Sequence, residues 1–178
     1  MQKLTTNNIV NLILFQGVWF FTVIGAANGS LLPGLISLAI FFVVHSFLSA
    51  TVSADFLLAA CAVVIGLAVE TVLVQTGLLI YPIETLSVVI VPLWILILWA
   101  NFALIMNGCI SWLHGRYFLA AVLGFMGGPL SYFGGINLGA ASAGGSLVML
   151  LLAVAMTYAM VTPLLLFLAQ HLVRFRSV

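Results

Sequence analysis

Charged residues are nearly absent from this sequence. Lysine, arginine, aspartate and glutamate make up 4% of its 178 residues, whereas about a quarter of the residues in a soluble domain are charged. The formal net charge of +1 leaves neither a basic surface for nucleic acid nor an acidic surface for a cationic partner. Hydrophobic residues make up 65% of the chain. This composition predicts an integral membrane protein and excludes nucleic acid as a partner.

The patterns of metal, redox and catalytic sites are also missing. The two cysteines, Cys61 and Cys109, lie in apolar runs at no metal-ligand spacing, so we expect neither a zinc site nor a disulfide. The sequence contains no nucleophile elbow, no phosphate-binding glycine loop and no metalloprotease helix. The acids Asp55, Glu70 and Glu84 fall at different depths, which disfavours a paired-carboxylate site. We therefore expect no cofactor and no metal, and enzymatic activity is not supported.

Long apolar runs dominate what is present. The run from Pro92 to Trp112 has no charged residue and no histidine, and as a helix it would match the ~30 Å hydrocarbon core of a bilayer. It carries Trp94, Trp99, Asn101 and Asn107, whose polar groups need partners in hydrocarbon, so we expect it inside a bundle. The sequence predicts one all-α domain, residues 1–178, with six transmembrane helices at residues 9–27, 31–48, 56–79, 87–113, 117–137 and 147–170.

The few charges predict the orientation of the chain. With six spans, Lys3, Arg116, Arg174 and Arg176 fall on the same side as both termini, and Glu84 falls on the other. Because basic residues are enriched on the cytoplasmic side, we expect both termini in the cytoplasm. Five or seven spans would separate the basic tail from Lys3.

Glu70 is the sharpest feature inside a predicted span. Ala62, Gly66 and Glu70 are spaced four apart, which places the carboxyl on a small-residue face that packs against other helices. An ionisable group within a span costs about 2.5 to 3.5 kcal/mol on insertion scales, so it suggests a functional site. The alternative is that Glu70 is protonated, or bonded to Gln16 or a tyrosine, and holds helices together.

Other polar side chains have simpler interpretations. His45 and His114 lie close to the expected cytoplasmic boundary, where we expect the imidazoles to be hydrated. Tyr81, Trp112 and Tyr117 are expected in the aromatic belts at the membrane surfaces.

A layer of polar and aromatic side chains is expected near the middle and outer half of the membrane. From it we predict an intramembrane cavity that binds a ligand, lined by Gln16, Trp19, Glu70, Trp94, Asn101, Tyr132 and Tyr158. Pro129 removes a backbone donor, so Gly127, Gly128 and Pro129 are expected to kink or break the fifth helix and give this cavity space.

These residues also carry a family resemblance that spans almost the whole chain. It depends on Phe15, Gln16, Trp19, Pro92, Leu93, Trp94, Leu98, Trp99, Gly128, Pro129, Leu130, Ser131, Tyr132, Leu138, Gly139 and Ala140. The chain resembles a family of small bacterial multi-pass inner-membrane proteins catalogued as a domain of unknown function, the twenty-eight seventy-eight family. The resemblance implies a Gram-negative inner membrane and several spans, and assigns no activity. Where the family is expected to carry an aspartate in the third helix, this sequence has Glu70.

Three classes of function remain open. The first is binding or transport of a small apolar or amphipathic molecule, such as a lipid, with Glu70 and Gln16 holding its polar end. The substrate-binding subunit of a vitamin importer is a related version, although the first helix lacks the alanine pair such subunits use to dock. The second is a lipid-modifying enzyme with Glu70 as acid or base. The third is a non-catalytic scaffold subunit whose partner would be another membrane protein or a second copy.

Overall fold

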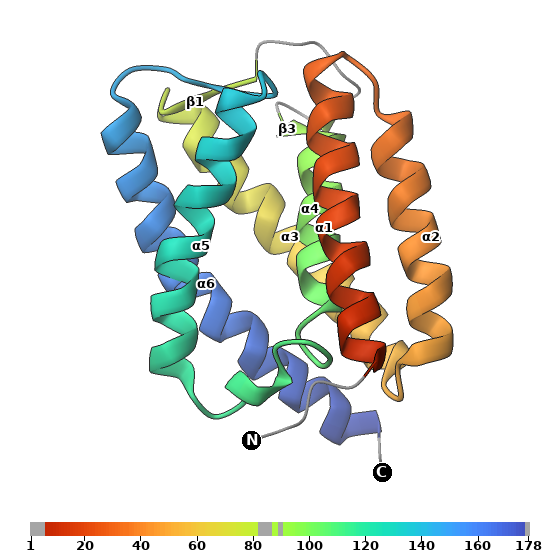
Figure 1. Ribbon diagram of the computed structural model, residues 1–178. Coiled ribbons are helices and arrows are strands. Elements are labelled where there is room, and N and C mark those ends of the chain that lie inside the picture. Colours follow the sequence, from red (N-terminus) through yellow and green to blue (C-terminus); the bar gives the residue numbers. More distant parts are fainter. Residues whose placement is uncertain (1–5, 82–86, 89–90, 177–178) are drawn as a thin grey trace.

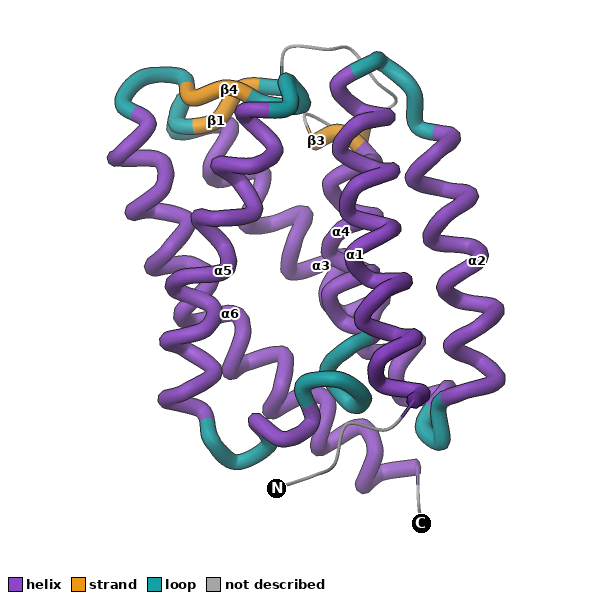
Figure 2. The backbone as a smooth tube through the Cα atoms, viewed as in Figure 1, coloured by secondary structure: helices purple, strands orange, loops and turns teal. Residues whose placement is uncertain are grey.

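The computed structural model describes residues 6–81, 87–88 and 91–176, and this part of the chain is mainly helical (Figure 1). Its six α-helices are α1 (Thr6–Ala27), α2 (Leu32–Leu48), α3 (Val52–Gln75), α4 (Leu93–Leu104), α5 (Tyr117–Asn137) and α6 (Leu147–Arg176). A short 3-10 helix, η1 (Ser111–Leu113), follows α4. Strand β1 (Leu79–Ile80) pairs antiparallel with β4 (Ser142–Ala143), and β2 (Ser87–Val88) pairs with β3 (Val91–Pro92). Helix α1 begins and α6 ends at one end of the bundle, and Figure 2 shows β1 and β4 at the other.

Helix α4 lies at the centre of the bundle. It packs against α1, α2 and α3, while α5 packs against α6 and α6 against α3. Nine of its twelve residues are buried, on every side of the helix. A helix that is apolar all round is one that is enclosed by other helices, so the composition of α4 reflects burial in protein. The prediction that this stretch lies inside the bundle is confirmed.

A glycine follows helix α1 and another follows helix α5, at the tight turns after these helices. Gly29, after α1, has φ 70°, and Gly139, after α5, has φ 85°. This left-handed conformation is strained for residues with a Cβ atom, and it lets the next amide return to the last helical turn. Ser30 N bonds to Gly25 O at 2.8 Å in this way. The connections between helices can therefore be short.

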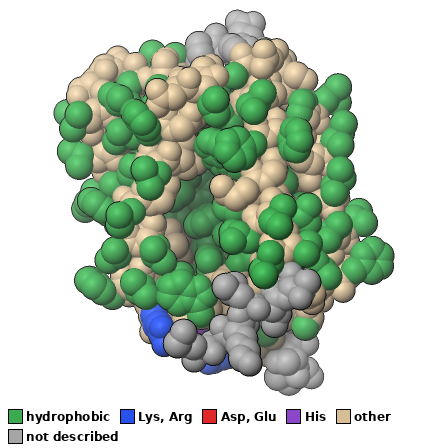
Figure 3. Space-filling view, viewed as in Figure 1, with side chains coloured by type: hydrophobic (Ala, Val, Ile, Leu, Met, Phe, Trp, Pro, Cys, Tyr) green, Lys and Arg blue, Asp and Glu red, His purple; other side chains and the backbone are tan. Residues whose placement is uncertain are grey.

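Four helices, α1, α3, α5 and α6, are long and apolar enough to cross a membrane. Helices α2 and α4 are also apolar but have 17 and 12 residues. Large apolar side chains such as Phe47 and Phe118 are exposed, and apolar side chains are spread over the face seen in Figure 3. The basic side chains visible in that view lie at the end where α6 finishes. An apolar exterior of this kind suits lipid, not water.

The predicted span at residues 87–113 is wrong in its extent. Residues Leu93–Leu104 form the helix, which is about 18 Å long, and strands precede it while turns and η1 follow it. The chain leaves the helix at Ile105 and bends through Asn107 and Gly108, where backbone bonds such as Ile110 N to Ile105 O at 3.2 Å close turns. The sequence run is long enough to span a bilayer, yet the helix within it is not.

The third helix is also shifted from its predicted range of 56–79. It begins at Val52 and ends at Gln75, because Gly77 adopts φ 69° and the chain then enters β1. The fifth helix has the predicted bounds, the first two agree within three residues, and α6 runs six residues beyond Gln170. Lys3 and Glu84, which enter the predicted orientation, lie outside the described residues.

Candidate functional site: a cavity between α1 and α5

A cavity of about 550 Å³ lies among α1, α4, α5 and α6. Figure 3 shows this cavity as a hollow in the surface between α5 and α1, with apolar side chains at its back. Of the seven residues predicted for the lining, six are on its wall: Gln16, Trp19, Trp94, Asn101, Tyr132 and Tyr158. Glu70 is not among the lining residues. Six of the seven residues selected from the sequence pattern therefore lie around this one cavity, and these six come from four helices.

Glycines on α5 shape one wall of the cavity. A Cβ atom at Gly128 would lie 2.6 Å from Cγ of Tyr158, so glycine lets α5 and α6 pack closely there. At Gly127 a Cβ atom would have nothing within 4 Å, because this position faces open space at the cavity. Pro129 is not on the wall, and α5 continues as one helix from Tyr117 to Asn137, so Pro129 does not break it.

Glu70 lies behind the wall and joins three donors from different parts of the chain. Its side chain is 0% exposed. Tyr81 Oη donates to Oε2 at 2.7 Å, Trp99 Nε1 donates to Oε1 at 2.9 Å, and Tyr132 Oη also donates to Oε1. These donors come from the segment after α3, from α4 and from α5. Glu70 points inward, as predicted, and it orients residues of the wall.

Tyr81 differs from its prediction as a membrane-surface residue. Besides donating to Glu70, it lines the cavity and packs edge-on against Trp94, with ring centroids 5.4 Å apart. Trp99 packs beside Tyr158 at 5.3 Å, and α3 approaches its indole ring directly at Gly66. The small residue one turn before Glu70 therefore makes room for the ring whose N–H the carboxyl accepts.

Helix α1 forms another side of the cavity, and two polar contacts join it to α4 and α5. Asn101 Nδ2 on α4 donates to the Phe15 carbonyl at 3.1 Å, and Trp19 Nε1 donates to Ser131 Oγ on α5 at 2.8 Å. Gln16 is exposed on the same wall, and its amide makes no hydrogen bond with another described residue. The Trp19–Ser131 bond thus bridges the two helices that flank the hollow.

The family model of a protein of unknown function (DUF2878) matches residues 8–164. The chain belongs to this family. The family resemblance predicted from the sequence is confirmed, and the matched range contains every residue named above on the cavity wall. No curated protein and no solved structure matches the chain.

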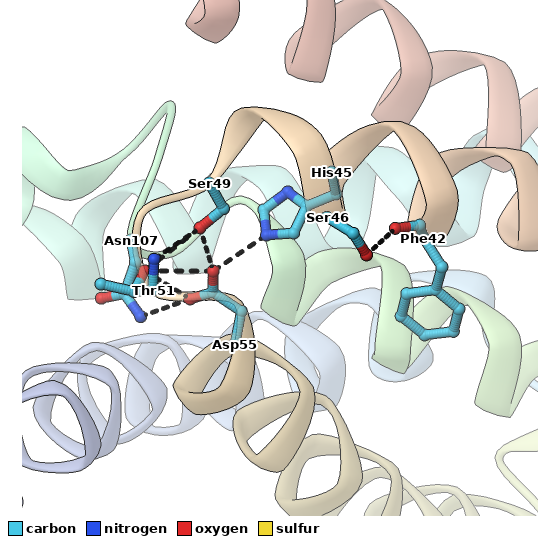
Figure 4. Close-up of polar contacts among 7 residues, drawn as sticks. All are labelled: Phe42, His45, Ser46, Ser49, Thr51, Asp55 and Asn107. Carbon is cyan, nitrogen blue, oxygen red and sulfur yellow. Dashed lines mark hydrogen bonds and ion pairs between the residues drawn. The ribbon is translucent and has the colours of Figure 1, made fainter. Parts of the chain in front are cut away.

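A second polar cluster lies where α2 turns into α3 (Figure 4). Asp55 in the first turn of α3 accepts bonds from His45 Nε2 at 2.9 Å, Ser49 Oγ at 2.5 Å, Thr51 Oγ1 at 3.1 Å and Asn107 Nδ2 at 2.7 Å. His45 is 1% exposed, so its predicted hydration is wrong. The carboxylate ties the α2–α3 turn to the turn after α4, and this role was missed at the sequence level.

His114, in the turn after η1, also differs from a fully hydrated imidazole. It is partly buried, and its Nε2 lies 3.1 Å from the Met106 carbonyl. Burial disfavours the imidazolium and so lowers the pKa of His114, although the Met106 carbonyl opposes this shift. Within the described residues, no group of three or more histidine, cysteine or acidic side chains could hold a metal ion.

Proposed function

We propose that this DUF2878 protein crosses a bacterial inner membrane six times, with both termini in the cytoplasm, and binds a small apolar or amphipathic molecule such as a lipid in its cavity. The cavity is the observation that best supports this proposal. It is hollowed into an apolar side of the bundle, between α1 and α5, so a molecule dissolved in the bilayer can reach it sideways. Four helices are long and apolar enough to cross a membrane, and six crossings also require α2 and the segments that flank the short helix α4 to cross it.

The wall of the cavity suits such a ligand. Its lining is mainly aromatic and aliphatic, and its volume of about 550 Å³ falls within the ~300–1,000 Å³ of small-molecule sites. Along α5 the lining runs from Leu123 to Gly135, which is about 18 Å of helix. Glu70 supports this wall by holding Trp99 and Tyr132 and does not itself contact the space. An elongated apolar molecule is the occupant that matches this shape.

The two other classes of function are less well supported. Both oxygens of Glu70 are occupied by donors and the side chain is fully buried, which does not suit an acid or base that must reach a substrate. Glycine faces of α1 and α5 would be the docking surfaces of a scaffold, but three of these glycines pack within the chain: Gly124 and Gly128 against α6, and Gly25 against Ser30 and Pro33. These three glycines are therefore not available to dock a partner.

The proposed orientation predicts which turns can be labelled from outside. In a variant without the native cysteines, Asn28→Cys in the α1–α2 turn should react with a membrane-impermeant maleimide in intact cells, and Arg116→Cys should react only after lysis. Asn28 and Arg116 are both exposed, so the two sites differ in side and not in access. The reverse labelling pattern would invert the orientation, and equal labelling of both would contradict it.

Filling the cavity should expel its occupant. The variant Gly127→Phe places a ring in the open space of the cavity, whereas Gly17→Phe adds the same ring where a Cβ atom also meets nothing, at a position outside the lining. We expect molecules that co-purify with the wild type in native lipid, identified by mass spectrometry, to fall at least about tenfold in Gly127→Phe and to persist in Gly17→Phe. Equal retention in both variants would refute binding at this site.

A further inference from the structure

Among the described residues, the cavity wall carries no aspartate, glutamate, lysine, arginine or histidine. The nearby carboxyl of Glu70 is buried behind the wall, with donors on both oxygens. A phosphate, carboxylate or ammonium group in this space would lose its hydration without gaining a partner of opposite charge. Such a transfer is strongly unfavourable in a medium of low dielectric constant. The part of the ligand that enters the cavity must therefore be uncharged.

One polar group on the wall is exposed and unsatisfied. Gln16 lies ten residues after the first residue of α1, about 15 Å along the helix and so near the middle of a ~30 Å hydrocarbon layer. At that depth a lipid headgroup is out of its reach, and an amide that faces an apolar molecule without a hydrogen-bond partner is costly. A glutamine amide both donates and accepts hydrogen bonds. A ligand with one hydrogen-bonding group would satisfy it.

Asn101 supports the same conclusion from α4. Its Nδ2 bond to the Phe15 carbonyl defines the orientation of the amide, and this carbonyl belongs to the residue before Gln16. The Asn101 side chain is 1% exposed, and its Oδ1 has no partner among the described residues. A buried acceptor therefore lies unpaired just behind the wall, close to the segment that carries Gln16. The two amides make this part of the wall polar without making it charged.

We infer that the cavity selects an uncharged, elongated apolar molecule with a single hydrogen-bonding group such as a hydroxyl, held by Gln16 near the middle of the membrane. This inference builds on the proposed function, which requires only that an apolar or amphipathic molecule enters. A phospholipid with its charged head at the membrane surface would bring only an acyl chain into the cavity and would leave the Gln16 amide without a partner, so it is not the occupant that we infer. The hydroxyl of the ligand bonds to Gln16, and its chain extends along α5 past Gly127.

The test is competition for the cavity in nanodiscs. The reporter is a dodecane carrying a mid-chain diazirine, whose photo-adducts on α1 and α5 are located by mass spectrometry. The competitors are dodecanol, dodecane, dodecyl sulfonate and dodecyltrimethylammonium, each titrated over the same range of fractions of the nanodisc lipid. They share one chain and differ in the head, so differences in competition report the preference for a head. Gln16→Met, which keeps the size of the side chain and removes the amide, is compared with the wild type.

We expect dodecanol to displace the reporter from the wild type at about a tenfold lower fraction than dodecane, and the two ionic competitors to be no better than dodecane. In Gln16→Met dodecanol should fall to the level of dodecane, while labelling by the reporter persists. Equal competition by alkane and alcohol in the wild type, or an advantage for either ion, would overturn this inference and leave the proposed function standing. Absence of adducts from the cavity would defeat the proposed function itself.

Discussion

Replacing Glu70 with leucine is expected to lower the free energy of unfolding by about 2 to 5 kcal/mol, because three buried donors lose their shared acceptor. Tyr81 Oη, Trp99 Nε1 and Tyr132 Oη all donate to this carboxyl, and leucine offers nothing in its place. The measurement is unfolding in mixed micelles with increasing sodium dodecyl sulfate, followed by tryptophan fluorescence. The loss is large because a carboxyl with 0% exposure has no water to substitute for its partners.

Glu70→Gln is the matched control for this prediction. Its carbonyl oxygen can accept from Trp99 and Tyr132, and its amide nitrogen can donate to the Tyr81 oxygen, so the network is kept with one bond reversed. We expect this variant to stay within about 1 kcal/mol of the wild type, and to retain co-purifying molecules that Glu70→Leu loses. If Glu70→Leu were as stable as the wild type, the carboxyl would not be holding the cavity wall together.

Replacing Asp55 with leucine should destabilise the protein by about 3 to 5 kcal/mol, because removing one partner of a buried polar pair leaves the others unpaired. Four side chains donate to this carboxylate, and for the buried His45 the bond from Nε2 to Asp55 is its only side-chain hydrogen bond among the described residues, because Nδ1 has no partner (Figure 4). The cluster joins the α2–α3 turn to Asn107, so its loss should also loosen the turn after α4. Unfolding in mixed micelles gives the magnitude.

Ser46→Ala is the comparison variant for the Asp55 cluster. Ser46 follows His45 in α2, is exposed, and bonds to the Phe42 carbonyl of its own helix at 2.7 Å. Its replacement should change the free energy of unfolding by less than about 0.5 kcal/mol. A loss below about 1 kcal/mol in Asp55→Leu would show that the cluster is an incidental arrangement of a surface turn.

The helices could be predicted from the sequence where lipid imposes their length. The apolar runs of α1, α5 and α6 are bounded by polar or glycine-rich turns, and a bilayer requires about 20 apolar residues to cross it. Helix α4 could not be predicted in this way, because burial by protein and burial by lipid select the same apolar residues. Asn107 and Gly108 were a signal that the helix ends early, since both suit a turn better than a span.

The site could be predicted in part for a similar reason. Trp94, Asn101, Tyr132 and Tyr158 lie deeper in the predicted helices than belt residues do, and the structure places them around one cavity. The position of Glu70 behind the wall depends on long-range packing, because its three donors come from segments 11, 29 and 62 residues away. Helical spacing predicts the face on which a residue lies, and it cannot predict which distant side chains meet it.

The Asp55 cluster shows the same limit at shorter range. His45 and Asp55 are ten residues apart, on either side of a turn, and no helical period relates them. The short polar segment from Ser49 to Asp55 between two apolar helices was a signal, since Ser49 and Thr51 both donate to the carboxylate. The predicted helix at residues 87–113 included Asn107, so the sequence did not indicate that Asn107 lies in a turn beside Asp55.

The central claim is that a molecule from the bilayer occupies the cavity between α1 and α5. The most direct measurement is the anomalous scattering of bromine in crystals grown in a lipid mesophase with a long-chain alcohol brominated along its chain. The account predicts a bromine peak inside the cavity beside Gly127, with the hydroxyl at Gln16, and loss of this peak in Gly127→Phe. Bromine found only on the outer lipid-facing surface, with α1 packed closely on α5, would contradict it.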